Sequence, residues 1–228
     1  MNLDQRLTIL NKIYRLYDDF AGTLDVACKK YCAECCTVNV TMTTLEGDLI
    51  ARHIVSNGPA DVFIQAKGAI SKNRFKPQTT TNRLAGLCAK GDDPPEEENG
   101  RSNENCPLLR DDLCPIYRVR PFGCRCFIST HDCRKAGYAE VSPFVITVNT
   151  LFLQIIEHID NMGFSGNLTD ILLLVASKNN RDHYRMNTLK QPDSGVVSNA
   201  PVAVLMIPPE HRIKVKPILD ALLSITSS

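Results

Sequence analysis

The residues of this chain whose types and spacing suggest chemistry are its clustered cysteines. Four of them lie within one short stretch, Cys28-Lys-Lys-Tyr-Cys32-Ala-Glu-Cys35-Cys36. A second group follows further along the chain, at Cys106, Cys114, Cys124 and Cys126. Thiolates are soft ligands that suit zinc and iron-sulfur clusters, and such sites usually take four of them. Because ordinary core packing does not require this clustering, the spacing predicts that the eight thiols bind metal.

Eight thiols exceed the needs of one site, so two arrangements are open. In the first, both groups supply ligands to one shared site, and the remaining thiols serve a second metal, a redox pair or simple packing. In the second, the eight thiols make two complete sites. Adjacent residues such as Cys35 and Cys36 point to different sides of a helix or a strand, so they can face different sites.

The spacing of the second group also bears on the identity of the metal. It lacks the paired C-x-x-C spacing of zinc fingers and zinc ribbons. An irregular ligand set is at least as natural for an iron-sulfur cluster, so we expect a [4Fe-4S] cluster, with zinc as the alternative. Two interpretations without metal compete with this one: free cysteines packed as small buried hydrophobes, and disulfides if the chain were exported.

Two further cysteines lie outside the predicted ligand set. Cys88 falls on an expected helix without a near cysteine neighbour, so core packing is the simpler interpretation. Cys133 lies close to the second group, in the stretch His131-Asp-Cys133, and could replace Cys126 as a ligand.

Three arginines lie among the downstream cysteines, at Arg118, Arg120 and Arg125. Four thiolates around a zinc ion leave a net charge of about minus two, which nearby guanidinium groups can offset. Guanidinium groups also donate hydrogen bonds to sulfur and so tune a cluster from outside its ligand shell. We therefore expect these arginines to support the cofactor, the alternative being ion pairs with Asp111, Asp112 or the run of three glutamates at 96–98.

At these positions the chain resembles the YkgJ-type cysteine-cluster family, whose members are described as zinc- or iron-chelating proteins. The family motif is C-x-x-C-x-x-C-C, followed by C-P-x-L, C-x-I-Y-x-x-R-P and C-R. The matching elements here are Cys32, Cys35, Cys36, Cys106-Pro107-Leu108, Cys114-Pro115-Ile116-Tyr117, Arg120-Pro121 and Cys124-Arg125. The chain departs from the motif in the three residues between Cys28 and Cys32, and in Ala33, where glycine is common.

The resemblance covers residues 28 to 130 and implies a metal, an iron-sulfur cluster above all, without fixing a reaction. A related cysteine arrangement occurs in the flagellin lysine N-methylase. Protein lysine methylation is therefore a further alternative, although no glycine-rich nucleotide loop follows a strand in this sequence.

Composition sets limits on the partners of the protein. Lysine plus arginine (26) nearly balance aspartate plus glutamate (25), so the overall charge favours neither nucleic acid nor an anionic membrane. The N-terminus carries Asp4 and Arg6 where a signal peptide needs an apolar run, and no apolar run approaches the roughly 20 residues that span a bilayer. We expect a cytoplasmic protein whose partner is an unidentified protein or redox partner.

The elements that must position the cysteines follow from apolar periodicity and capping signals. Helices are expected over residues 3–20, from the capping box of Thr43 and Glu46, over 63–70, over 83–88, from Ser142-Pro143 to Gly163, from Asn167 onward and over 218–223. Short strands are expected at 38–40 and 202–207, and loops at 91–105 and 178–200.

The sequence therefore predicts a mainly α fold: a single compact helical domain over 1–228 with irregular cysteine-rich metal-binding loops and at most a short strand pair. The metal-binding core should span about 28–133 and a helical C-terminal part 142–228. The expected function is an iron-sulfur protein for redox chemistry, electron transfer or sensing. The alternatives are a structural zinc scaffold and a cluster-dependent enzyme, and the sequence does not decide whether the protein is an enzyme.

Overall fold

The N-terminal helix forms where the apolar periodicity predicts it. The computed structural model describes residues 1–29, 31–59, 61–70, 73–97, 102–193 and 195–227. Helix α1 (Leu3–Gly22) begins at a capping box in which Asn2 and Gln5 bond each other's backbone amides. Its buried face includes Leu7, Leu10 and Tyr14, so burial of this stripe rather than intrinsic propensity holds the helix in place.

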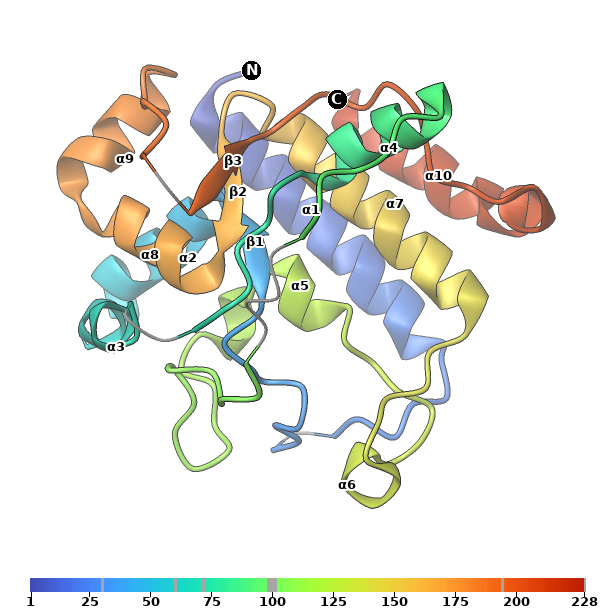
Figure 1. The fold of residues 1–228 in the computed structure, drawn as a ribbon, viewed down its shortest axis with the longest axis horizontal. Helices are drawn as coiled ribbons and strands as arrows, with labels where there is room; N and C mark the ends of the chain where they lie inside the picture. Colours follow the sequence, from blue (N-terminus) through green and yellow to red (C-terminus); the bar gives the residue numbers. More distant parts are fainter. Residues whose placement is uncertain (30, 60, 71–72, 98–101, 194, 228) are drawn as a thin grey trace.

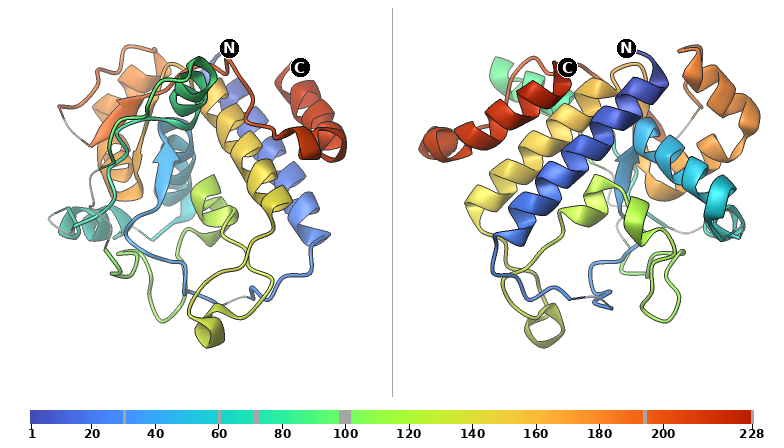
Figure 2. Two further views of the ribbon diagram at one scale, coloured as in Figure 1. Left: turned by 45° about the vertical axis from the view of Figure 1, so that its right-hand side comes forward. Right: turned by 180° about the vertical axis from the view of Figure 1, so that it is seen from behind.

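Helix α1 packs in one layer with two helices from the C-terminal half of the chain. Helix α7 (Pro143–Ile159) starts at the predicted Ser142 cap with Pro143 in its first turn, and α10 (Arg212–Thr226) closes the chain. The three helices contact one another pairwise, as the rear view in Figure 2 shows. They enclose the first of two apolar cores, which contains Leu10, Phe122 and Phe152 at 0% exposure.

The second core lies between a small sheet and three shorter helices. Strands β1 (Thr41–Thr43), β2 (Phe164–Asn167) and β3 (Val196–Ser198) form an antiparallel sheet in the order β1-β2-β3. Helices α2 (Thr44–Asn57), α3 (Val62–Gly68) and α8 (Leu168–Ala176) pack together beside it. Thr43 caps α2 with Glu46 as predicted, and Asn167 caps α8.

The mainly α prediction is confirmed, but two details of the C-terminal half are wrong. The predicted loop at 178–200 contains helix α9 (Lys178–Arg185) and β3, so the sheet has three strands rather than a pair. The predicted strand at 202–207 does not form, because the Gln154 side chain donates to the carbonyl of Val204 and accepts from the amide of Met206. β3 instead takes the free edge of β2.

The remaining elements are short and lie near the cysteines or on the surface. Helix α4 (Thr81–Lys90) packs on α7. A 3-10 helix (Tyr117–Val119), α5 (Phe122–Arg125) and α6 (Cys133–Ala136) interrupt the cysteine-rich loops. The predicted loop at 91–105 includes residues 98–101, which are outside the described residues, and its residues 91–97 are exposed.

The cysteine-rich segments gather at one end of the molecule, the lower end in Figure 1, opposite both termini. Segments distant in sequence thus become neighbours at this end, where the helical layer and the sheet leave a loop-built region. Within the described residues, no helix is both long and apolar enough to cross a membrane.

Candidate metal centre

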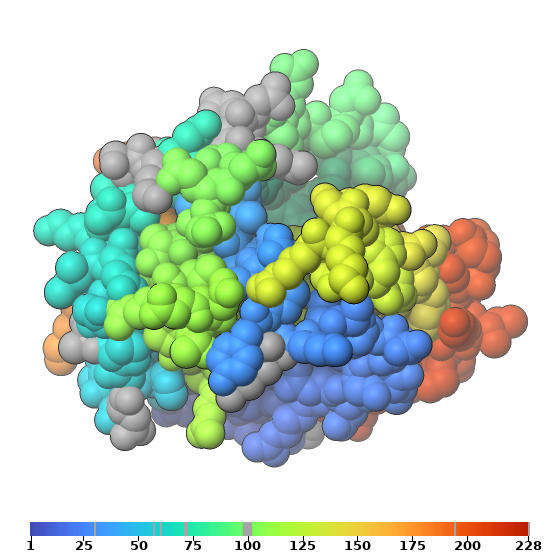
Figure 3. Space-filling model, turned by 90° about the horizontal axis from the view of Figure 1, so that it is seen from below, coloured from blue at the N-terminus to red at the C-terminus, as the bar shows by residue number. Residues whose placement is uncertain are grey.

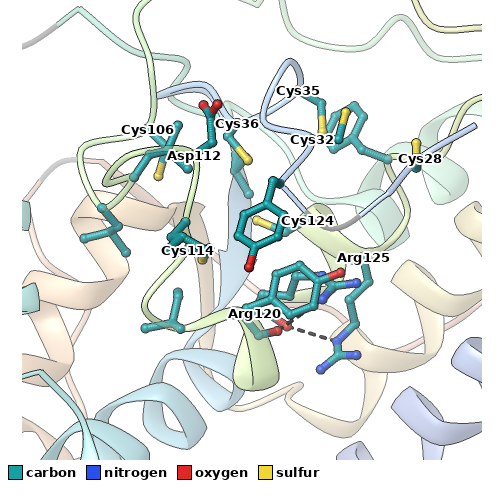
Figure 4. A pocket seen from close by; sticks show the side chains of 18 of the residues that line it. Cys28, Cys32, Cys35, Cys36, Cys106, Asp112, Cys114, Arg120, Cys124 and Arg125 are labelled. Atoms are coloured by element: carbon teal, nitrogen blue, oxygen red, sulfur yellow. Dashed lines mark hydrogen bonds between the residues drawn. The ribbon is translucent and has the colours of Figure 1, made fainter. Parts of the chain in front are cut away.

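Seven of the eight predicted cysteine ligands line one cavity of about 440 Å³, which we call the cysteine cavity. They are Cys28, Cys32, Cys35, Cys36, Cys106, Cys114 and Cys124. Figure 4 shows their sulfur atoms in two groups, with those of Cys32 and Cys35 near each other toward Cys28, and the other four on the opposite side. All ten cysteines of the chain are free thiols.

Two backbone contacts join the upstream and downstream cysteine segments. The amide of Cys106 donates to the carbonyl of Cys36 at 2.8 Å, and the amide of Val38 donates to the carbonyl of Glu104 at 3.0 Å. Thr37 and Asn105 form the antiparallel bridge between these bonds. The two halves of the predicted site are therefore fixed to each other by backbone pairing, which the sequence did not reveal.

A tight turn brings Cys106 and Cys114 to the same cavity. Arg110 and Leu113 exchange backbone hydrogen bonds of 3.0 and 2.7 Å across the turn. The two residues between them, Asp111 and Asp112, have φ values of 46° and 60°, as in a type I′ hairpin. Aspartate tolerates this left-handed conformation better than most side chains.

Cys124 reaches the cavity on the short helix α5, whose first residue is held by a buried carboxylate. The Glu46 side chain, 3% exposed, accepts from the amide of Phe122 and from the hydroxyl of Tyr14, both at 2.7 Å. Phe122 stacks on Phe152 with ring centroids 5.5 Å apart. Glu46 was identified from the sequence only as a capping partner, because its bond to α5 spans residues that are distant along the chain.

Cys126 differs from the other seven predicted ligands in its surroundings. It packs against the core around α1 and α7, whereas Cys106, Cys114 and Cys124 pack against the other core. Its thiol points to the carbonyl of Gly123 at 3.6 Å, and burial raises its pKa to about 12. The structure therefore places Cys126 outside the lining of the cysteine cavity.

The two remaining cysteines also have distinct positions. Cys88 is exposed on α4 and is not a core residue, so the core-packing interpretation of this residue is wrong. Cys133 begins α6, and its thiol lies 3.9 Å from the carbonyl of His131.

All three predicted arginines line the cavity, but their hydrogen bonds differ. Arg120 lines the cavity, stacks over Tyr117 with its guanidinium carbon 3.9 Å from the ring centroid, and donates to the Tyr117 carbonyl. The guanidinium of Arg125 instead donates to the carbonyls of Arg118 and Arg120 and pairs with Asp18. Arg118 also lines the cavity, although its side chain is exposed overall.

Burial controls the protonation of the cavity thiols. It raises the pKa of Cys106 and of Cys114, and it raises that of Cys124 well above the ordinary range. At Cys114 a backbone hydrogen bond at Ile116 and the charge of Arg120 act in the opposite direction. The pKa of Cys35 is raised by its hydrogen bond with the Cys36 thiol and then by burial. The raised pKa values keep the thiols of Cys35, Cys106, Cys114 and Cys124 protonated at neutral pH, so a metal bound there must displace their protons.

The donor set has the chemistry of a soft metal site, but it is not pre-assembled. The cavity gathers seven thiols, and thiolates select zinc and iron-sulfur clusters over hard cations. Among the residues that the structure describes, no three histidine, cysteine, aspartate or glutamate side chains lie close enough together to hold an ion as they stand. Ligation therefore requires the cysteine loops to draw together, which is typical of sites whose metal completes the fold.

No family model, curated protein or solved structure matches this chain. The resemblance to the YkgJ-type family therefore remains a prediction that rests on its motif residues.

Proposed function

We propose that this protein is a metal-binding protein that holds a [4Fe-4S] cluster through cysteine thiolates and serves electron transfer, sensing or another redox role. The observation that supports it is the convergence of seven cysteines from separate segments on one cavity. Core packing does not explain this convergence, because these thiols line an open cavity instead of filling the core.

Four of the seven thiols are the best candidates for the cluster, and we call them the inner thiols: Cys36, Cys106, Cys114 and Cys124. Three of them pack against the core around α2 and α8, and the fourth is tied to Cys106 through its backbone. After burial, the charges of Cys106 and Cys114 are the next largest causes of the raised pKa of Cys124. Cys106, Cys114 and Cys124 are thus close enough to interact electrostatically on a well-packed frame, and the charges of Cys126 and Cys35 act on Cys124 more weakly.

When bound, the cluster would supply one-electron redox chemistry. The protein supplies its surroundings, with Leu108 and Ile116 at 1% exposure forming an apolar wall of the cavity. Arg120 places a positive charge near the thiolates, which stabilises the more negative reduced state and raises the reduction potential. Tyr31 and Tyr117 line the cavity and are about half exposed, so the site lies near the surface where a redox partner can approach.

The first test is the metal and acid-labile sulfide content of protein purified without oxygen, with its visible absorption spectrum. We expect iron with matching sulfide and a brown colour in the wild-type protein. Cys114→Ser should give insoluble or metal-deficient protein, because it removes an inner thiol, whereas Cys88→Ser, at an exposed cysteine outside the cavity, should keep the full iron content.

Other outcomes separate the alternatives. Wild-type protein without iron and sulfide, or equal iron in both variants, would overturn the cluster assignment. Colourless protein with stoichiometric zinc would support a structural scaffold, since zinc has no redox change to offer. Turnover of a methyl donor with a lysine substrate, lost in Cys114→Ser, would support an enzyme.

A further inference from the structure

Three cysteines line the cysteine cavity on the side away from the inner thiols. They lie near Cys133, which does not itself line the cavity. Cys28, Cys32 and Cys35 line the cavity on the side away from the inner thiols (Figure 4). After burial and a hydrogen bond with the backbone of Ser129, the charges of Cys32, Cys35 and Cys133 are the remaining causes that set the pKa of Cys28. Cys133 therefore lies near Cys28, while Cys35 lies near both Cys28 and the inner thiols Cys36 and Cys124.

Hydrogen bonds hold the Cys133 segment against the upstream cysteine loop. The Arg134 guanidinium pairs with Glu34 at 3.0 Å and donates to the carbonyl of Tyr31 at 3.2 Å. At the other end of the loop, the amide of Ala27 donates to the carbonyl of Ser129 at 2.8 Å. Both flanks of Cys133 thus contact residues that adjoin Cys28, Cys32 or Cys35, and Figure 3 shows the two segments on the same face.

The segments of Cys28 and Cys133 both contact the backbone of residues 129–131. The amide of Ala27, next to Cys28, donates to the carbonyl of Ser129, and the Cys133 thiol lies 3.9 Å from the carbonyl of His131, which also accepts from the Ser129 hydroxyl at 2.8 Å. Cys126, the rival in sequence, packs against the core around α1 and α7. The charge of Cys35 also acts on Cys126, but Cys126 does not line the cavity, so the contacts of the Cys133 segment with the upstream loop favour Cys133.

We infer that Cys28, Cys32, Cys35 and Cys133, the outer thiols, form a second tetrathiolate site, separate from that of the inner thiols, which takes a soft divalent ion of the zinc type. Four thiolates are the usual complement of such an ion. Binding replaces four S–H bonds with four metal–sulfur bonds and releases four protons to solvent, without any change of oxidation state.

The two sites should differ in how well the surrounding protein is packed. The inner thiols rest on residues such as Leu108 and Ile116, at 1% exposure, whereas exposed residues such as Glu34 and Arg134 flank the outer thiols. Since the outer loops have little packing of their own, the ion must organise them, so we expect weaker and more exchangeable binding there. This inference goes beyond the cluster proposal and does not require iron at the inner thiols.

The test is an anaerobic titration of the full, reduced, metal-free chain with Co²⁺, whose thiolate charge-transfer absorption counts the tetrathiolate sites. Wild-type protein should bind about two equivalents, and Cys133→Ser about one. Cys126→Ser is the matched control and should keep both, because its thiol faces the helical core. Whatever Cys114→Ser protein is soluble should lose the other equivalent.

His131 is a rival candidate for the fourth ligand, so His131→Gln is a second control. Its Nε2 atom is buried without a hydrogen-bond partner among the described residues, and its Nδ1 atom lies 2.9 Å from Glu140. This pairing with a carboxylate is common for metal-binding histidines. If His131→Gln or Cys126→Ser loses one equivalent and Cys133→Ser keeps two, the fourth ligand is not Cys133 and the inference fails.

Peptide-level alkylation of wild-type protein gives a readout that does not depend on how any variant folds. At saturating Co²⁺ the outer thiols should be protected, and during a chelator challenge Cys28 and Cys133 should become reactive before Cys106 and Cys124. One equivalent with only the inner thiols protected would overturn the second site and leave the cluster proposal intact. No bound Co²⁺ would overturn the second site, and if the purified protein also lacked iron and sulfide, the cluster proposal would fail separately.

Discussion

At the scale of single residues, Arg125 joins the candidate metal centre to the helical core. It is 8% exposed, its guanidinium donates to the carbonyls of Arg118 and Arg120 at 2.8 and 3.0 Å, and it pairs with Asp18 on α1. Its guanidinium carbon also lies 4.1 Å from the ring centroid of Tyr14. Arg125 therefore fixes the backbone on which Arg120 is carried.

Replacing Arg125 by lysine should therefore disturb the site although the charge is kept. An ammonium cannot reproduce the planar fork that serves two carbonyls and a carboxylate together, so we expect a loss of about 2 kcal/mol in the free energy of unfolding. Bound metal per chain should fall as well. Denaturant unfolding and metal analysis of Arg125→Lys check this, with Arg15→Lys at an exposed arginine of α1 as the control; equal values in both variants would contradict the positioning role.

At the scale of elements, the four-residue helix α5 is too short to be stable alone and depends on its neighbours. Glu46 accepts from the Phe122 amide at the start of α5, from Tyr14 on α1, and from Thr43 at the cap of its own helix. One buried carboxylate thus links three elements and sets the position of Cys124.

Glu46→Gln should loosen α5 with little change in side-chain volume. The amide nitrogen of glutamine is a donor where the carboxylate oxygens only accept, so at least one buried donor loses its partner, at a cost of about 1–3 kcal/mol. Faster alkylation of Cys124 in the metal-free protein is the expected local readout. Glu210→Gln, at an exposed glutamate before α10, is the control and should leave both the stability and the reactivity of Cys124 unchanged. If Glu46→Gln also leaves both unchanged, Glu46 does not position α5.

At the scale of the whole molecule, Asp160 holds the helical layer and the sheet together. It is fully buried at the end of α7, where its carboxylate pairs with Arg6 at 3.3 Å and accepts from Thr44 at 2.8 Å and from the Leu45 amide at 3.0 Å. The hydroxyl of Tyr184 also donates to it. Burial raises the pKa of Asp160 to about 6, while these donors act in the opposite direction.

The raised pKa of Asp160 predicts a pH dependence of stability with a definite sign. Between its ordinary value of 3.8 and about 6, the folded state binds the proton more tightly than the unfolded state. The contribution of Asp160 is therefore complete below pH 4 and falls by about 3 kcal/mol as the pH rises through 6.

Denaturant unfolding of metal-free protein from pH 4 to pH 7 tests this. The stability advantage of wild type over Asp160→Asn should narrow as the pH rises. Asp220→Asn, at an exposed aspartate on α10, should track the wild type at every pH. An advantage that widens instead would mean that the donors outweigh burial.

The sequence by itself determined the elements whose signals are local. The apolar stripe of α1, the capping box of Thr43 and Glu46 and the Ser142-Pro143 start of α7 depend on residues within a few positions of one another, and all three formed as predicted. The clustering of cysteines also predicts soft-metal chemistry from ligand type and spacing alone, and this stays a prediction.

Only the tertiary structure decided which distant groups meet. β3 and α9 lie in a polar stretch whose backbone partners and caps come from elsewhere in the fold, so no local period revealed them. The same holds for the thiols: Cys126 and Cys133 lie close together along the chain, but Cys126 packs against the helical core, whereas Arg134 ties the Cys133 segment to the upstream cysteine loop. Backbone pairing and side-chain direction set this difference, since both depend on contacts between residues far apart along the chain.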